Sequence, residues 1–165
     1  MKQILLLVLF TLTLSGCEKD DICDENTSTT PNVVIEFYDA ASPNTLKNVT
    51  NLKVVANGFT EALTGTSAVS KIKVPLQTNL DATTWQFIQN GLDNDATNDN
   101  EDILNFTYLR ETVFVSRACG YKIVYDLTNS NTNLVATDAD NWIDHITIIQ
   151  PNIDTENETH IKIYF

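Results

Sequence analysis

Short segments in which apolar and polar residues alternate recur along most of the chain, and they constrain the fold more than any other feature. Val33, Ile35 and Phe37 show the spacing first, and it returns near residues 52–56, 71–76, 85–88, 104–109, 113–127, 146–149 and 161–165. Turn-forming pairs such as Asn57-Gly58 and Asn90-Gly91 separate these segments. Because successive side chains of a strand point to opposite faces, roughly eight to ten short strands are expected.

This pattern predicts one all-β domain over residues 31–165, a single antiparallel β-sandwich that is Ig-like in general architecture. A small closed barrel is the alternative. Residues 39–48, 93–102 and 129–133 are expected to be loops. Pro75 lacks a backbone N–H, so it places its strand at a sheet edge or ends it.

Three further expectations concern the second half of the chain. Gly120 is expected to mark a bulge or bend between two halves of one strand. The runs 146–149 and 161–165 are expected to pair as a terminal hairpin. A short turn near residues 138–144 is the only helix we expect.

The N-terminus has the organisation of a secretory signal peptide. Lys2 precedes an apolar stretch that runs from Ile4 to Leu14, and the small residues Ser15 and Gly16 follow. A positive start, a short apolar region and a small-residue cleavage site are typical of such peptides. The stretch is about half of the ~20 residues that a membrane-spanning helix needs, so we expect residues 1–16 to be removed.

The segment Leu14-Ser15-Gly16-Cys17 resembles the lipobox of bacterial lipoproteins. The resemblance implies that the Cys17 thiol carries diacylglycerol, that the chain is cut before Cys17, and that the new amine receives an acyl chain such as palmitate. One acyl chain anchors a protein only marginally, whereas two or three make attachment effectively permanent. The alternative is an ordinary secreted protein with a cysteine near its cleavage site.

Residues 17–30 are polar and acidic and are expected to form a tether between the lipid and the domain. Within it, Lys19, Asp20 and Asp21 resemble the export signal that Bacteroidota lipoproteins use to reach the outer face of the outer membrane. The resemblance implies a lipid-anchored protein at the cell surface. The alternatives are the periplasmic leaflet and a tether that is polar without being a signal.

The strongly acidic composition limits the partners that the protein can have. The net charge is −12, and loss of Lys2 with the signal peptide makes it one unit more negative. Nucleic acids and anionic lipid surfaces both bind basic patches, so this balance argues against either as an electrostatic partner.

Two cysteines, Cys23 and Cys119, remain once Cys17 is committed to lipid. The compartment outside the cytoplasm is oxidising, so such a pair usually forms a disulfide. Metal ligation and a reactive thiol are the alternatives, but no His or third Cys stands at ligand spacing. We expect a structural disulfide that ties the tether to a late strand.

An acidic, Asn-rich loop between residues 93 and 102 is the candidate for a metal site. Calcium binds several hard oxygens, and alternate carboxylates of one loop can converge on it. The candidate ligands are Asp93, Asp95, Asp99 and Glu101. The loop does not match an EF-hand, because its sixth and twelfth positions from Asp93 are Asn98 and Leu104. The alternative is a solvated turn whose Asp and Asn side chains bond the backbone.

No residue is assigned a catalytic role. Asp144 and His145 are adjacent, but no Gly-x-Ser-x-Gly motif supplies a nucleophile for them. His145 and His160 are too far apart in sequence to suggest a metal pair, and both are expected on the surface. Arg117 is expected to be a buried structural arginine, with a recognition role as the alternative. Core packing is the expectation for Trp85 and Trp142, although exposed tryptophans could bind sugars.

Three segments, residues 17–23, 30–39 and 113–122, resemble a small lipoprotein family of flavobacterial-type Bacteroidota, catalogued only as a domain of unknown function. Ser116-Arg117-Ala118-Cys119-Gly120-Tyr121 is the most specific part of the resemblance. It supports the lipoprotein prediction and the pairing of Cys23 with Cys119. It implies no activity.

We therefore expect a membrane-anchored envelope lipoprotein, at the cell surface, that binds or scaffolds a partner without catalysis. The expected partners are the membrane, through the lipid on Cys17, and an unidentified envelope protein or glycan. No cofactor is expected. The alternatives are a calcium-dependent adhesion or carbohydrate-binding module and a hydrolase with paired carboxylates.

Overall fold

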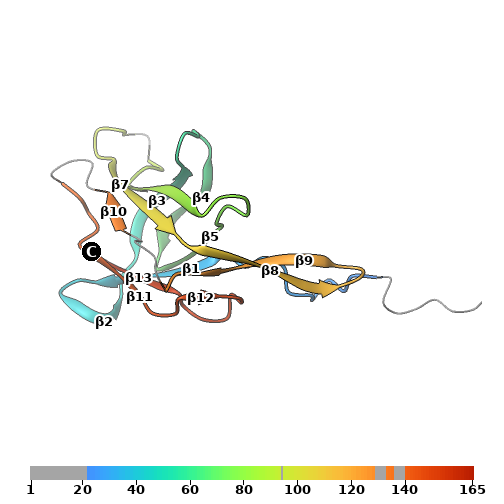
Figure 1. Cartoon of the computed structure of the whole chain (residues 1–165). Helices are drawn as coiled ribbons and strands as arrows, with labels where there is room; N and C mark the ends of the chain where they lie inside the picture. The colour runs from blue at the N-terminus through green and yellow to red at the C-terminus, as the bar shows by residue number, and fades with distance from the viewer. Residues whose placement is uncertain (1–21, 94, 129–132, 136–139) are drawn as a thin grey trace, which may run out of the picture.

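The computed structural model describes residues 22–93, 95–128, 133–135 and 140–165, which form strands and loops without a helix (Figure 1). The predicted signal peptide, Cys17 and the predicted export signal lie outside this range, as do most of the expected 129–133 loop and residues 136–139. None of the described segments is a helix long and apolar enough to cross a membrane. The prediction of an all-β fold is confirmed.

The first sheet is built around β1 (Val33–Asp39). One side of β1 pairs in parallel with β13 (Ile161–Tyr164), which pairs antiparallel with β11 (His145–Ile148). The other side pairs antiparallel with β2 (Ser42–Leu46) and β5 (Lys71–Val74). The β11–β13 pairing confirms the expected terminal hairpin, whereas the parallel β1–β13 pair makes this sheet mixed and not purely antiparallel.

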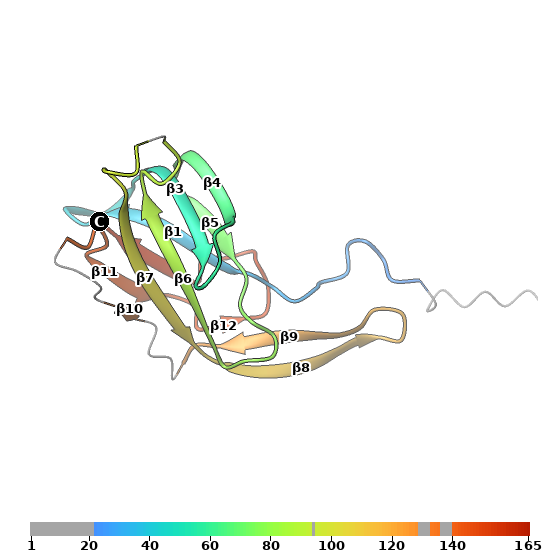
Figure 2. The ribbon, with the colours of Figure 1, turned by 90° about the horizontal axis from the view of Figure 1, so that it is seen from above.

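The second sheet is antiparallel throughout and has the order β10-β7-β6-β3-β4. Its strands are β3 (Val49–Ala56), β4 (Ala62–Val69), β6 (Ala82–Gln89), β7 (Asn100–Thr107) and β10 (Asn133–Val135). The two sheets lie one behind the other in Figure 2. They form the expected sandwich, called the body below.

One buried core joins the two sheets. Along β6 and β7, every second residue is buried, so the alternation in the sequence matches the observed burial. Phe37 from the first sheet and Phe87 and Phe106 from the second are fully buried in this core. Burying such side chains stabilises the fold by roughly 1.5–3 kcal/mol each.

A third, three-stranded sheet leaves the body. It has the order β12-β9-β8, with β8 (Leu109–Ser116), β9 (Gly120–Asp126) and β12 (Asn152–Ile153). Strands β8 and β9 form a long hairpin, called the arm below, that projects from the body in Figures 1 and 2. With about 3.3 Å per residue, β8 alone is roughly 26 Å long.

Several local predictions are wrong. Residues 42–46 form β2 where a loop was expected, and the sequence pattern does not predict β4. Residues of β2 are exposed throughout, so no apolar face marks it in the sequence. Residues 140–144 are not helical. Gly120, with a φ of 72°, begins β9 after the turn, and a register shift of the β8–β9 pair lies beside it, so the expected irregularity is present but joins two strands of a hairpin and not two halves of one strand.

Candidate functional site

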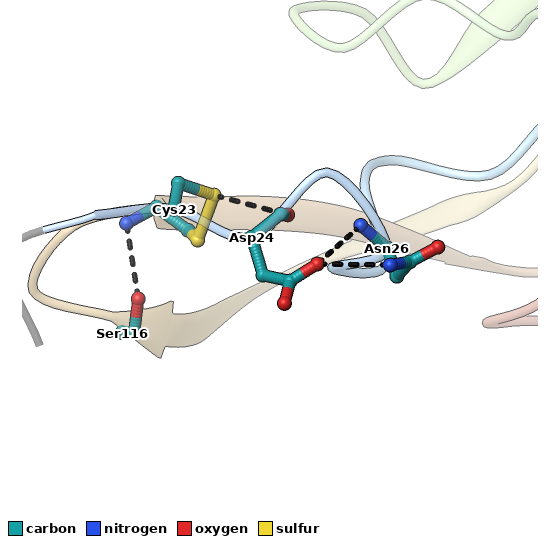
Figure 3. Close-up of a disulfide and its surroundings, with 5 residues drawn as sticks. Cys23, Asp24, Asn26 and Ser116 are labelled. Carbon is teal, nitrogen blue, oxygen red and sulfur yellow. Dashed lines mark hydrogen bonds between the residues drawn. A yellow bond between two sulfur atoms is a disulfide. The ribbon is translucent and has the colours of Figure 1, made fainter. Parts of the chain in front are cut away.

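The arm is joined at its tip to the start of the described chain. A disulfide connects Cys23 to Cys119, the pairing that the sequence predicts, and Cys119 lies in the turn between β8 and β9 (Figure 3). The Ser116 hydroxyl accepts a hydrogen bond of 3.0 Å from the Cys119 backbone N–H, which holds the turn. The tip of the arm therefore lies next to residue 23, six residues after Cys17.

The tether runs along β9 from this disulfide to the body. Thr30 Oγ1 accepts a 3.0 Å hydrogen bond from the backbone N–H of Ile123. Lys122 Nζ donates to Ser28 Oγ at 2.9 Å and to the Asp154 carbonyl at 3.1 Å. Near the body, β12 pairs with β9 as an antiparallel strand. The tether and β12 thus cover the β9 edge, which protects it from pairing with other chains.

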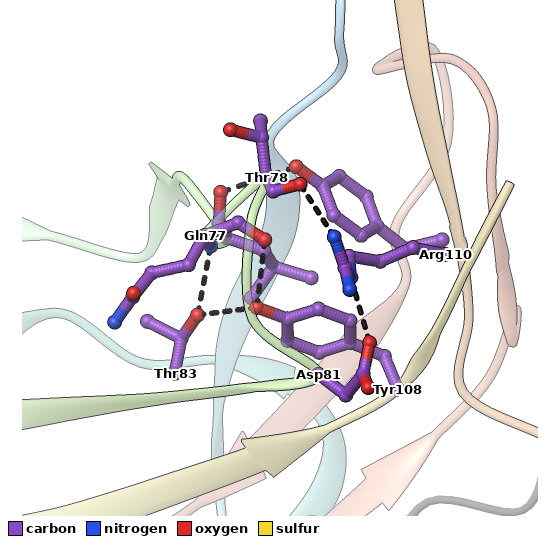
Figure 4. Close-up of polar contacts among 8 residues, drawn as sticks. Gln77, Thr78, Asp81, Thr83, Tyr108 and Arg110 are labelled. Atoms are coloured by element: carbon purple, nitrogen blue, oxygen red, sulfur yellow. Dashed lines mark hydrogen bonds and ion pairs between the residues drawn. The ribbon is translucent and has the colours of Figure 1, made fainter. Parts of the chain in front are cut away.

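A polar network fixes the arm where it meets the body (Figure 4). The Tyr108 hydroxyl, just before β8, lies 2.7 Å from Thr83 Oγ1 and donates to the Gln77 carbonyl at 3.0 Å. Arg110 donates to the Asp81 carboxylate and to the Thr78 carbonyl, both at 2.7 Å. Because these partners all lie between residues 77 and 83, the network joins the β5–β6 loop to the base of the arm.

Two tyrosines pack at the same base. The rings of Tyr108 and Tyr125 meet edge to face with their centroids 5.1 Å apart, and the Tyr125 hydroxyl donates to the Leu76 carbonyl. Burial, with a smaller contribution from Tyr108, raises the pKa of Tyr125 to about 12. Burial also raises the pKa of Tyr108. Both phenols therefore stay protonated at neutral pH and act as hydrogen-bond donors.

A cleft of about 480 Å³ opens beside the arm base. Its lining includes the carboxylates of Glu111, Asp126 and Asp154. Asp126 accepts a hydrogen bond from the Thr128 N–H at 2.6 Å, and its hydrogen bonds to Thr128 lower the pKa of Asp126. The acid of a glycoside hydrolase needs a raised pKa, so Asp126 does not suit that role.

A second hollow, the Phe59 groove, lies on the body and has a volume of about 550 Å³. Phe59 and Leu80 are exposed at its rim, whereas Leu76 and Trp85 are buried at its floor. The Trp85 indole N–H donates to the Pro75 carbonyl at 3.0 Å. This surface offers a partner two exposed apolar side chains, and the sequence pattern did not single it out.

Two of the four candidate calcium ligands, Asp93 and Asp95, accept hydrogen bonds within the loop. Asp93 Oδ1 accepts from the Asp95 N–H at 2.9 Å, and Asp95 Oδ1 accepts from the Thr97 N–H at 3.1 Å. Glu101 lies in β7, which begins at Asn100. The loop expected over residues 93–102 therefore ends earlier than predicted. Within the described ranges, no three His, Cys, Asp or Glu side chains are grouped so that they could hold a metal. Calcium binding stays a prediction.

The following acidic residue, Asp102, is structural. It is fully buried in β7, and its Oδ2 accepts a 2.7 Å hydrogen bond from the Ile143 N–H. The carboxylate thereby connects the second sheet to the segment that leads into β11. Asp102 lies two residues before Leu104, on the same face of β7, and this spacing is the sequence signal that could have indicated its burial.

One histidine prediction is wrong. His160 is fully buried, and its Nδ1 accepts a 2.9 Å hydrogen bond from the Val34 N–H. The backbone N–H of His160 donates to the Val34 carbonyl at 3.0 Å, which extends the β1–β13 pairing by one residue. His145 is exposed as expected and lies 2.7 Å from Asp144 Oδ2.

The expected burial of Arg117 is also wrong, because this residue is exposed in the turn at the arm tip. Arg117 lies in the turn between β8 and β9 and not on a strand face that packs against the core. The two tryptophans do pack against the core as expected. Trp85 is buried, and the Trp142 indole N–H donates to the Phe87 carbonyl at 3.1 Å.

Comparison with known families identifies a matching family model. A model described as "Family of unknown function (DUF6452)" matches residues 51–165, which include the arm, its base network and the body strands from β4 onward. No curated protein and no solved structure matches the chain.

Proposed function

The chain belongs to this family of unknown function, and from that premise we propose that it is a lipid-anchored lipoprotein of the cell envelope that binds or scaffolds a partner without catalysis. In this proposal Cys17 carries the lipid, residues 1–16 are removed, and Lys19, Asp20 and Asp21 direct the protein to the outer face of the outer membrane. The periplasmic leaflet is the alternative location.

One observation carries the proposal: the tip of the projecting arm is bonded to residue 23. Six extended residues reach at most roughly 20 Å, so a lipid on Cys17 would keep the tip close to the membrane. The polar network at the arm base and the tether along β9 would then hold the body at the far end of the arm. Such a construction suits a spacer that presents a binding surface.

The Phe59 groove is the surface that we propose for the partner, an envelope protein or a glycan. Its buried Trp85 floor and exposed Phe59 rim combine apolar area with neighbouring polar groups, as binding sites often do. In the arm-base cleft, hydrogen bonds to Thr128 lower the pKa of Asp126, which makes this residue unsuitable as the general acid of a hydrolase.

The anchor is tested by replacing Cys17 with alanine. The parent protein should incorporate a labelled palmitate analogue, and C17A should not. Incorporation by C17A that equals the parent would refute lipidation at this residue.

The proposed location on the outer face of the outer membrane is tested by replacing Lys19, Asp20 and Asp21 together with alanine. The parent should be cleaved by protease added to intact cells, whereas the triple variant should be lipidated but protected until the cells are lysed. A parent that resists protease in intact cells would instead place the protein in the periplasmic leaflet.

The groove is tested by crosslinking in intact cells, with the parent compared with Phe59→Ser. The side chain of Phe59 is 70% exposed, so the substitution should leave the fold intact. Loss of specific crosslinked products in F59S, but not in the matched surface variant Leu109→Ser, is the expected result. Identical products from all three proteins would exclude the groove.

A further inference from the structure

An aromatic pair lies exposed near the tip of the arm. Phe114 of β8 and Tyr121 of β9 are direct cross-strand partners, and their rings meet at a centroid distance of 5.3 Å. Phe114 is 57% exposed and Tyr121 is 68% exposed. Two large rings are therefore held together in solvent, where they contribute little to the buried core.

The pair continues the face of the arm that packs on the body. The side chains of residues 121, 123 and 125 lie on one face of β9, because successive side chains of a strand point to opposite faces. Tyr125 is buried in the core and Ile123 packs against it, but Tyr121 lies beyond them toward the tip. This apolar face of the arm packs on the core at the arm base and continues, exposed, toward the tip. An exposed apolar surface of this kind indicates a contact surface.

The location of the pair identifies what it contacts. Ile22, which is 80% exposed, adjoins the Cys23–Cys119 disulfide at the same tip. In both views the chain that begins at residue 22 lies beside the end of the arm (Figures 1 and 2). Only five residues separate Cys17 from Cys23, so a lipid on Cys17 would keep the tip within roughly 20 Å of the membrane surface.

We propose that the arm tip inserts Phe114, Tyr121 and Ile22 into the headgroup region of the membrane that holds the lipid on Cys17. This inference rests on the proposed lipid anchor. Aromatic rings favour the boundary between headgroups and acyl chains, where an apolar body and a polar hydroxyl are both accommodated. The anchor and the tip then make two attachments, which fix the direction of the arm relative to the membrane.

Charge at the tip specifies the kind of lipid surface. Arg117 is exposed in the turn and can bind a lipid phosphate through its planar guanidinium. Asp24 and Glu25 lie beside the disulfide, and the whole chain carries a net charge of −12. Because these charges repel an anionic surface, the contact is with zwitterionic headgroups and depends on apolar insertion and not on net charge.

The experiment places a tryptophan at the tip of the full lipidated protein. Phe114→Trp is reconstituted into phosphatidylcholine vesicles that contain a lipid with a doxyl spin label near the glycerol backbone. The matched control is Phe59→Trp, which replaces another exposed phenylalanine, on the body. The fluorescence of the parent, which contains Trp85 and Trp142, is subtracted from both.

The expected result is loss of fluorescence at position 114 on adding the labelled lipid, with none at position 59. Equal quenching, or none at 114 in protein that floats with the vesicles, would overturn the inference while leaving the lipid anchor intact. A blue shift at 114 that grows with protein density without quenching would assign the tip to a second copy of the chain, which also overturns it. Protein that does not float would refute the proposed anchor and the inference together.

Discussion

Replacing Cys23 and Cys119 with serine should lower the free energy of unfolding by about 2–4 kcal/mol. The disulfide joins residues 96 positions apart. For a loop of about this length, the chain-entropy model gives about 4.7 kcal/mol at 25 °C, because the bond restricts the unfolded chain. The tether is mostly exposed, so its release also restores freedom to the folded protein, and the expected loss lies below this figure.

The assay is equilibrium unfolding in guanidinium chloride, followed by the fluorescence of the buried Trp85. The double variant should unfold at a lower midpoint, and the reduced parent protein should behave in the same way. The unfolding free energy of the double variant should depend more steeply on denaturant concentration, because an unfolded chain without the bond exposes more surface.

The control is Ser116→Ala, which keeps the disulfide and removes only the hydroxyl that accepts from the Cys119 N–H. It should cost about 1 kcal/mol. A double variant as stable as the parent, or a loss equal to that of S116A, would show that the arm tip does not constrain the chain as reasoned above.

Three further predictions concern the body and the arm base. Asp102→Ala should destabilise the protein by about 1.5–3 kcal/mol in denaturant unfolding, because it leaves the buried Ile143 N–H without its carboxylate; an effect below about 0.5 kcal/mol would contradict this. Tyr108→Phe should cost about 1–2 kcal/mol by the same measurement, since it removes the hydroxyl that contacts Thr83 and Gln77, and an unchanged midpoint would contradict the network. Burial lowers the pKa of His160, although the charges of Glu158, Asp154 and Glu156 act to raise it. As the pH falls, this imidazole is therefore protonated in the unfolded chain before it is protonated in the folded protein. Between about pH 6.5 and 5, above the range in which carboxylates titrate, thermal stability should therefore fall as the pH falls, whereas His160→Asn, whose Oδ1 can accept from the Val34 N–H, should keep its stability over that interval.

Strands with one buried face were predictable, and the fully exposed strand β2 was not. In β5 and β6 the buried residues alternate with exposed or half-buried ones, so burial and sequence share the same period. The edge strand β2 is exposed along its whole length, and its backbone pairing with β1 leaves no mark in the order of its side chains. Pro75 directly follows β5, so its missing N–H did locate the end of a strand.

The disulfide at the arm tip was predictable from the sequence, whereas the Phe59 groove was not. Cysteine count and compartment led to the Cys23–Cys119 pair, because only one intramolecular pairing existed. The same reasoning could not place Arg117 or His160. A side chain's burial depends on what packs over it, and neither residue carries that information locally.

Residues 113–127 show where sequence and tertiary structure divide. The alternation by itself determined that these residues extend as β-strand, and the cysteines determined that the segment is bonded to the tether. Only the folded chain decided that it turns at residues 117–119, that Phe114 meets Tyr121, and that the resulting arm projects from the body with its tip at residue 23. The physical reason is that strand periodicity is a local property, whereas the direction of a hairpin depends on long-range contacts at its base, here those of Tyr108 and Arg110 with residues some thirty positions earlier.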